Sequence, residues 1–171
     1  MPDYTFNTPA GETIARELLI AYLNTGTASA PVWSPLGNRT TDSSEEYDWS
    51  RESSQDILGH TRTKMKKPVI TQTFDPWELD GGDAAIMKIH QLAVREQNAQ
   101  ALCNLDMLIV HLYTDGNFAE RYDACSVEAT GLGGEGGGNV GMPITVTYGG
   151  TRTVGSASKE GGSVTFTPEA A

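Results

Sequence analysis

The sequence predicts a mainly β protein: a β-sandwich or partial barrel with one flanking α-helix and a long protruding hairpin. Three observations support this prediction. Several apolar segments of strand length are bounded by turn residues, only one segment has a helical period, and one long polar stretch is strand-like at both ends. With 171 residues, the chain is expected to form a single domain with a substantial core.

The balance of charge limits the partners of this protein. The chain carries 22 Asp and Glu residues against 12 Lys and Arg residues, which gives a net charge of −10 at pH 7. Phosphate backbones repel such an acidic chain, so we do not expect it to bind nucleic acid tightly.

The N-terminal sequence and the cysteines bear on the cellular compartment. Residues 1–6 lack the basic and apolar regions of a secretory signal, and no apolar run approaches the roughly 20 residues of a membrane helix. Cys103 and Cys125 both fall in strand-like segments, where we expect buried, reduced thiols. These features predict a protein that is made and folded in a cytoplasm.

Before residue 38 the chain is expected to form an arm and two strands. Residues 1–12 form the polar arm. The segment 14–23 is apolar on both faces, which is typical of a buried strand, with a short helix as the alternative. Residues 32–36 form a short strand in which Pro35 favours a sheet edge.

The segment 38–67 is long and polar, and it predicts a charged hairpin. Its arms are residues 44–52 and 61–69, joined by a turn at 53–60. Because side chains alternate between the faces of a strand, one face collects charged side chains and the other collects apolar ones. The charged face carries Glu46, Asp48 and Glu52 on the first arm and Arg62, Lys64 and Lys66 on the second, whereas Tyr47, Trp49 and Met65 have the opposite parity.

Two interpretations of this hairpin remain open. An antiparallel pairing of the arms sets acids opposite bases, and such pairs contribute roughly 0.2–1 kcal/mol each. The same pairing gathers the aromatic side chains on the other face. The segment is either an ordinary solvated hairpin or an arm whose apolar face needs a partner.

One amphipathic helix is predicted at residues 83–98. Pro76 breaks the preceding strand, Gly81 and Gly82 allow a change of direction, and Asp83 suits the N-cap. The helix then presents an apolar stripe with the spacing i, i+3, i+7, formed by Ile86, Ile89 and Ala93.

Strands are expected to follow the helix. Residues 102–113 are apolar on both faces and predict a central strand, and residues 119–129 predict the strand that returns beside it. Residues 140–148 alternate between apolar and small or polar side chains, which is typical of a half-buried strand. Val164 and Phe166 mark a last short strand.

No motif predicts catalysis, a cofactor or a metal. Gly136, Gly138 and Gly141 match a dinucleotide-binding pattern formally, but a strand follows them instead of the required helix, so a flexible loop at 131–139 is favoured. The three histidines, His60, His90 and His111, fall in different elements. We therefore expect no catalytic residue, no cofactor and no metal site.

Taken together, the layout resembles the major tail tube proteins of tailed bacteriophages, which are related to the inner tubes of contractile bacteriocins and injection systems. The resemblance rests on an early apolar strand, the long charged hairpin, one helix after the passage from Phe74 to Asp83, and two later β-hairpins. It covers most of the chain through loose motifs. It implies a β-sandwich or partial barrel flanked by a helix.

The resemblance also implies a structural role without enzymatic activity. Subunits of this family form hexameric rings that stack into a tail tube, the conduit for the genome, which is assembled in the host bacterial cytoplasm and becomes part of the virion tail. The implied partners are further copies of the chain and the tape measure, tail terminator and baseplate proteins, with the sheath as a further candidate. DNA would pass through the lumen without specific binding.

Specific residues follow from the same resemblance. The family's long hairpin contacts neighbouring subunits, so the implied assembly residues are Glu46, Tyr47, Asp48, Trp49, Arg62, Lys64, Met65 and Lys66. Lumens in this family tend to be acidic, which fits the composition, and strands 102–113 and 140–148 are the candidates for framing the wall.

Two alternatives stay open at this point. The chain would also suit the tube of a contractile bacteriocin-like particle. A protein from another class, a small β-sandwich carbohydrate-binding or adhesion domain, would expose Trp33, Trp49 and Trp77 to stack on sugars.

Overall fold

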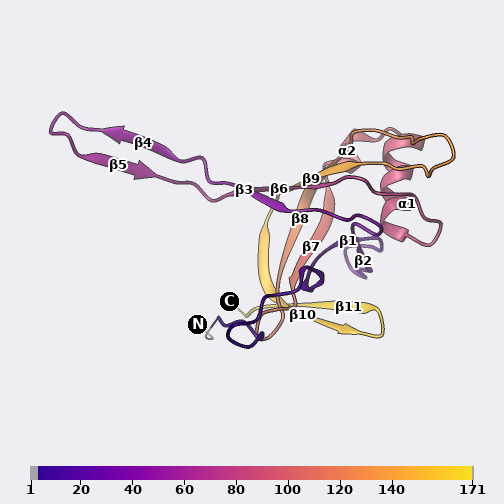
Figure 1. Cartoon of the computed structure of the whole chain (residues 1–171), viewed down its shortest axis with the longest axis horizontal. Helices are drawn as coiled ribbons and strands as arrows, with labels where there is room; N and C mark the ends of the chain where they lie inside the picture. The colour runs from indigo at the N-terminus through magenta and orange to yellow at the C-terminus, as the bar shows by residue number, and fades with distance from the viewer. Residues whose placement is uncertain (1–3, 171) are drawn as a thin grey trace.

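The computed structural model describes residues 4–170. Over this range the chain forms one continuous antiparallel sheet that bends into two layers, with helices at one end and a hairpin projecting from the other (Figure 1). The strands are β1 (Leu19–Asn24), β2 (Trp33–Pro35), β3 (Glu45–Asp48), β4 (Glu52–Gln55), β5 (Thr61–Lys64), β6 (Val69–Phe74), β7 (Leu105–His111), β8 (Phe118–Ala129), β9 (Ile144–Tyr148), β10 (Arg152–Glu160) and β11 (Ser163–Pro168). The helical elements are η1 (Arg16–Leu18), α1 (Ala84–His90), η2 (Gln91–Arg95) and α2 (Ala99–Leu102). The predicted mainly β, sandwich-like fold is confirmed.

β8 is the strand at which the two layers separate. β7 pairs along one side of β8, and on the other side the first half of β8 pairs with β10 and the second half with β9. β9 leads into β10 through Gly150, which has a φ of 82° and where a Cβ would lie 2.1 Å from Asp123 Oδ1. That oxygen accepts a hydrogen bond from Thr151 N at 2.7 Å. Glycine at position 150 therefore allows the chain to leave one layer and enter the other at once.

The main core lies between the two layers and beneath α1. It draws apolar side chains from both layers and the helix, including the fully buried Leu23, Ile89, Met107, Ile109 and Ile144. Burial of each such side chain contributes roughly 1.5–3 kcal/mol relative to exposure. This core therefore holds the two layers and the helix together.

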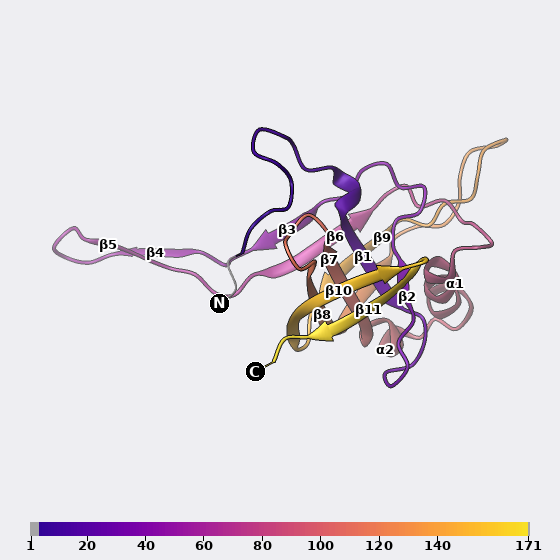
Figure 2. The same cartoon turned by 90° about the horizontal axis from the view of Figure 1, so that it is seen from below.

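A second, smaller core lies on the opposite face of β1, β7 and β8. Its buried members are Tyr22, Trp33, Leu108, Val110, Ala119 and Ala157, and Val164 and Phe166 of β11 pack against them. β11 lies against β2, so the layer β2-β1-β7-β8-β10-β11 curls towards closure (Figure 2). This curl gives the partial barrel of the predicted fold class.

The helix begins where the sequence predicts and ends earlier as an α-helix. Asp83 is the N-cap, and its Oδ1 accepts a hydrogen bond from Ile86 N at 3.3 Å. The α-helical part ends at His90, and a π-helical turn, η2, continues to Arg95. The helical run therefore ends at Arg95, three residues before the predicted end, and Gln97 beyond it has a positive φ of 50°.

Three expectations about strands and thiols are corrected by the structure. The first strand begins at Leu19, because residues 16–18 form the turn η1. β10 was not predicted at all, since only Val164 and Phe166 in β11 had marked a strand after residue 148. Cys125 is buried as expected, but Cys103 is exposed, because it follows the short helix α2 instead of lying in a strand.

Within residues 4–170, no helix combines the length and the apolar character needed to cross a membrane.

Candidate assembly surface

The base of the hairpin is part of the main sheet. β3 pairs with β6 in the register Glu45↔Gln72. Just before β3, Ser43 is buried; its Oγ accepts a hydrogen bond from Gln72 Nε2 at 3.0 Å, and its carbonyl oxygen accepts one from Arg16 at 2.8 Å. The first part of the predicted 38–67 hairpin is thus bound to the body, and only its outer part projects.

The outer part consists of β4 and β5, and all eight of their residues are exposed (Figure 1). Glu52 lies opposite Lys64 in the ladder, which agrees with the predicted pairing of acids with bases. The prediction is wrong for Glu46 and Asp48, which face Thr71 and Val69, because β3 pairs with β6 and not with β5. An exposed ion pair such as Glu52 with Lys66, at 4.0 Å, contributes about 0–1 kcal/mol.

The hairpin ends in a turn that is held by its own hydrogen bonds. Asp56 Oδ1 accepts hydrogen bonds from Leu58 N and His60 N, both at 2.9 Å. These backbone donors, first that of His60, lower the pKa of the Asp56 carboxyl and keep it ionised. The turn presents Ile57 and Leu58 to solvent at 101% and 76% exposure. Such an exposed apolar pair is typical of an interaction site.

The outer face of the layer β8-β9-β6-β3 is largely polar, with Val69 as an exposed apolar residue at its edge. The register aligns Glu46, Thr71, Thr147 and Ser126 in one row across the four strands, and it aligns Thr73, Thr145 and Glu128 in another. The sequences of β3, β6, β9 and the paired half of β8 contain no Lys or Arg. This face therefore carries hydroxyl and carboxylate groups, and these strands supply no Lys or Arg side chain to neutralise the carboxylates.

This face revises the predicted framing of a lumen wall. Within the described part of the chain, six of the seven residues of β7 are buried, because the strand lies between the two cores. The candidate strand 102–113 therefore has no side free to line a channel, and that prediction is wrong. β9 does offer a free side, through Thr145 and Thr147.

A cleft of about 750 Å³ lies behind the hairpin base and contains a buried ion-pair network. Glu120 accepts a hydrogen bond from Arg152 Nε at 2.6 Å, and its other oxygen lies 3.0 Å from His111 Nε2. Burial alone would raise the pKa of Glu120, but the hydrogen bonds with His111 and Arg152 outweigh burial and lower it. The network is satisfied, which is typical of a structural role.

Glu45 lies close to this network and is less well satisfied. Its Oε2 accepts a hydrogen bond from Tyr47 OH at 3.0 Å, whereas its buried Oε1 has no partner among the described residues. Burial raises the pKa of the Glu45 carboxyl. Over residues 4–170, no group of His, Cys, Asp and Glu side chains is arranged to hold a metal ion.

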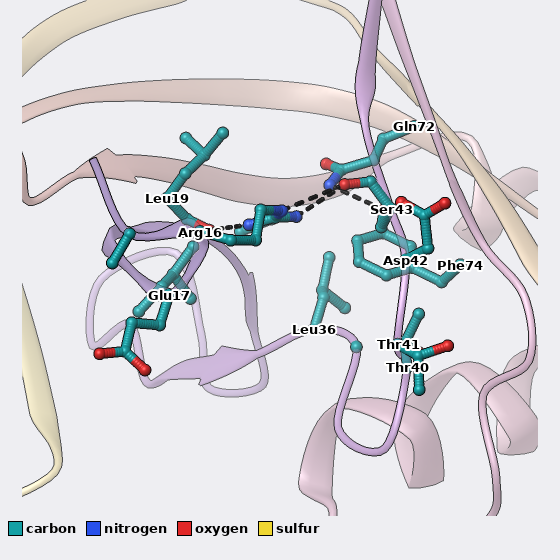
Figure 3. A pocket seen from close by; sticks show the side chains of 14 residues that line it. Arg16, Glu17, Leu19, Leu36, Thr40, Thr41, Asp42, Ser43, Gln72 and Phe74 are labelled. Atoms are coloured by element: carbon teal, nitrogen blue, oxygen red, sulfur yellow. Dashed lines mark hydrogen bonds between the residues drawn. The ribbon is translucent and has the colours of Figure 1, made fainter. Parts of the chain in front are cut away.

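An open groove of about 650 Å³ lies on the other side of the hairpin base (Figure 3). Its apolar lining comes from β1, β6 and the segment before β3, and includes Leu19, Leu36 and Phe74. Glu17 and Asp42 lie on opposite sides of the groove, and Arg16 spans its back between Leu19 and Ser43 (Figure 3). The groove thus combines an apolar floor with acidic sides.

Charge is divided unevenly between the hairpin and the rest of the chain. Residues 50–67 carry five of the 12 Lys and Arg residues and only two of the 22 Asp and Glu residues. The hairpin is therefore basic on a body that is strongly acidic. Opposite potentials of this kind favour contact between the hairpin of one molecule and the body of another.

The structure distributes the predicted assembly residues over three surfaces. Tyr47 and Trp49 stack at 6.3 Å and line the cleft, whereas Met65 is 57% exposed and does not join them there. Arg62, Lys64 and Lys66 lie on the outer hairpin, and Glu46 and Asp48 lie on the polar outer face. Ile57 and Leu58 were missed, although two apolar residues between Asp56 and Gly59 in a polar turn are a readable signal.

No protein-family profile matches the chain, and no curated protein sequence matches it significantly. Among solved structures, the fold is similar to that of the anti-feeding prophage cap, an AFP tube terminating cap, with a TM-score of 0.50 and 12% identity over 88% of this chain and 96% of that chain. This likeness shows that the two chains share a fold.

Two chains of the PVC extracellular contractile injection system are also similar to this chain. A chain of its sheath-tube complex in the extended state has a TM-score of 0.48 and 9% identity, over 86% of this chain and 94% of that chain. A chain of its sheath/tube terminator in the extended state has a TM-score of 0.48 and 9% identity, over 85% and 99%.

Proposed function

We propose that this chain is a structural subunit that self-assembles into hexameric rings, which stack into a tail tube through which a genome passes. The observation that carries the proposal is the outer face of β8-β9-β6-β3, with its hydroxyl and carboxylate rows and no Lys or Arg in those strands. A wall of this kind repels DNA phosphates, so the genome slides past without being bound. Salt screens the repulsion within roughly 10 Å.

The free edge of the same layer supports closure into a ring. β3 is the last strand in the sheet order and has no partner on its outer side within the described chain. Unpaired edges invite uncontrolled strand pairing, and a closed ring of subunits removes them. Six copies joined in this way would carry the polar face round a continuous inner barrel.

The hairpin would then join neighbouring copies. Its Lys and Arg side chains would make protein contacts instead of facing the DNA. The further partners are the tape measure, terminator and baseplate proteins, with the sheath as a candidate, in a virion tail assembled in the host cytoplasm. The assembly residues remain those on the hairpin and β3, namely Glu46, Tyr47, Asp48, Trp49, Arg62, Lys64, Met65 and Lys66.

Shortening the hairpin tests this proposal directly. Replacement of residues 51–65 by the dipeptide Asn-Gly removes only exposed strands and their turn. We expect the variant to keep the thermal unfolding midpoint of the parent within about 3 °C, because the core is untouched, and to form no rings or tubes in electron micrographs. Tubes formed equally well by the variant, or a parent protein that stays monomeric at high concentration, would contradict the proposal.

Hydrogen exchange provides a second measurement. In isolated subunits the amides of β4 and β5 are expected to exchange rapidly, because these strands bury no side chain. In the assembly the same amides are expected to be strongly protected. Equal protection of β4 and β5 in both states would argue against a hairpin that is ordered by assembly.

A second candidate is a tube or cap component of a contractile particle. The similarity to the anti-feeding prophage cap supports it, and binding of a sheath protein to preformed tubes would distinguish it from a tube without a sheath. The carbohydrate-binding alternative required exposed tryptophans, and two of the three are buried. Trp33 and Trp77 are 5% and 0% exposed, and only Trp49 is free to stack on a sugar.

A further inference from the structure

We propose that the hairpin tip of one copy docks into the groove of Figure 3 on a second copy. The proposal rests on the proposed function, because it names the contact through which copies of the chain join. It follows from two features of the same molecule: an apolar tip on a basic arm, whose turn is held by its own hydrogen bonds, and an open groove with an apolar floor and acidic sides.

The tip is shaped before any partner arrives. Asp56 holds the turn through the amides of residues 58 and 60, Gly59 N donates to Asp56 O at 3.0 Å, and Gln55 Nε2 donates to Gly59 O at 3.1 Å. Ile57 and Leu58 therefore point into solvent from a fixed backbone. A preformed binding element loses little conformational entropy on docking, so the exposed apolar pair is well suited to insertion.

The groove has the size and the lining to receive this pair. Its volume of about 650 Å³ falls within the roughly 300–1,000 Å³ of well-formed binding pockets. Gly37 has a φ of 85°, and a Cβ there would lie 2.9 Å from Phe74 Cδ1, so the segment before β3 crosses the Phe74 ring closely only because it has no side chain at that point. Leu19 is half-buried beside it, and Leu36 and Phe74, which are 8% and 3% exposed members of the main core, form the bottom of the groove.

The carboxylates at the sides of this groove are complementary in charge to the Lys and Arg side chains of the arm. Glu17 and Asp42 at its sides make no ion pair within residues 4–170. The guanidinium of Arg16 donates to Leu19 O at 2.6 Å and to Ser43 O, so it is engaged by the backbone. On the arriving copy, Arg62 lies at the second rung from the turn, and Lys64 and Arg51 lie further down the arm. The two surfaces therefore attract one another.

The other large hollows suit the tip less well. The cleft behind the hairpin base is lined by Lys67 and Arg152, and its buried acid, Glu120, is already paired with Arg152. The groove beside α2, of about 600 Å³, offers a single acid, Glu128. Neither place offers two carboxylates that lack an ion pair within residues 4–170.

Disulfide trapping between two full-length variants tests the contact. Both carry Cys103→Ser, which removes the exposed native thiol. One variant also carries His60→Cys at the tip, and the other carries Asp42→Cys at the groove together with a mass tag. The two are mixed at a concentration that gives assemblies, oxidised with a mild disulfide reagent, and analysed by mass spectrometry. In two matched control pairs, the tagged variant carries its cysteine elsewhere in place of Asp42→Cys. The control positions are Glu128→Cys and Glu160→Cys, the latter on the exposed end of β10.

We expect the tip-to-groove disulfide to form at least ten times faster than either matched pair. Faster trapping at position 128, or equal rates for all three pairs, would overturn this docking. In that case, if the parent protein still forms assemblies, the proposed function is retained and only the docking site is wrong. A parent protein that forms no assembly and gives no intermolecular disulfide would overturn both.

Charge reversal provides an independent readout. Arg62→Glu with Lys64→Glu is expected to raise the concentration needed for assembly at least ten-fold, and Glu17→Lys with Asp42→Lys in the same chain is expected to restore it. Lys159→Glu, on exposed β10, should have no effect. Failure of the second pair to restore assembly would mean that the groove is not where the hairpin docks.

Discussion

β7 and the outer hairpin are both antiparallel elements of one chain, yet they are stabilised in opposite ways. Six of the seven residues of β7 are buried, between the main core and the smaller core. All eight residues of β4 and β5 are exposed, and beyond the ladder these strands share a hydroxyl contact between Ser53 and Thr63 at 3.2 Å. The first element is held by burial and the second by local hydrogen bonds.

The difference indicates which part of the chain needs a partner. Cross-strand pairs contribute roughly 0.2–1 kcal/mol each, and an isolated two-stranded hairpin is at best marginally stable in water. The body would fold with or without the arm, because both cores lie outside it. The arm with its apolar tip is therefore the part for which we propose stabilisation by contacts beyond the subunit.

The same substitution in both regions gives the largest expected contrast. Ile109→Ala removes a fully buried side chain from the main core and is expected to lower the free energy of unfolding by about 2–5 kcal/mol. Ile57→Ala, at the exposed tip, is expected to change it by less than about 0.5 kcal/mol. Urea unfolding monitored by circular dichroism measures both. Similar losses would show that the tip is packed in the isolated subunit.

Two glycines with positive φ provide a second, smaller contrast. Gly150→Ala is expected to lower the free energy of unfolding by about 2–3 kcal/mol. The new Cβ would meet Asp123 and the backbone of Ala124, and alanine is also strained in this left-handed conformation. Gly59→Ala, with a φ of 85° and open space around it, is strained only locally, and opening of the tip relieves it without unfolding the body. Thermal unfolding should separate the two variants, and equal midpoints would contradict the role assigned to Gly150.

The parts of the fold that the sequence predicted are those in which local signals and burial agree. The strand containing Ile109 is apolar on both faces, and the helix carries its own cap at Asp83. β10 was missed because its sequence, from Arg152 to Glu160, has no apolar alternation. It pairs with the next strand, β11, through a tight turn at residues 161–162, and with β8, which is distant in the sequence.

The candidate site was predicted in part for the same reason. The hairpin and its basic residues were visible in the sequence, but the pairing of Glu46 and Asp48 with β6 depends on where the hairpin joins the sheet. The groove of Figure 3 brings Glu17 and Asp42 together from separate segments, which no local pattern encodes. Trp77 packs in the main core, where its indole N–H donates to Asp83 Oδ2 at 3.0 Å, and the sequence alone does not predict this contact.

Glu45 lies at the joint between the two regions and combines features of both. It belongs to the strand that leads into the hairpin, but its side chain is directed towards the interior. The charged and titratable groups that act on it are Tyr47, His111, Glu120 and Arg16. Burial outweighs the favourable neighbours and raises its pKa, so the folded state holds the proton of Glu45 more tightly than the unfolded chain does.

The smallest predicted effect is therefore a pH-dependent one at Glu45. Because the folded pKa is raised, the full stability is present below the unfolded pKa of about 4.3 and falls as pH rises towards the folded pKa. Glu45→Gln removes this loss, so the variant should match the parent near pH 4 and exceed its free energy of unfolding by about 1 kcal/mol at pH 8. Glu46→Gln, on the exposed outer face of the same strand, is the matched control and should show no such divergence. Urea titrations across this pH range measure the difference, and a gain for Glu45→Gln that grows towards acid pH would reverse the sign and refute the assignment.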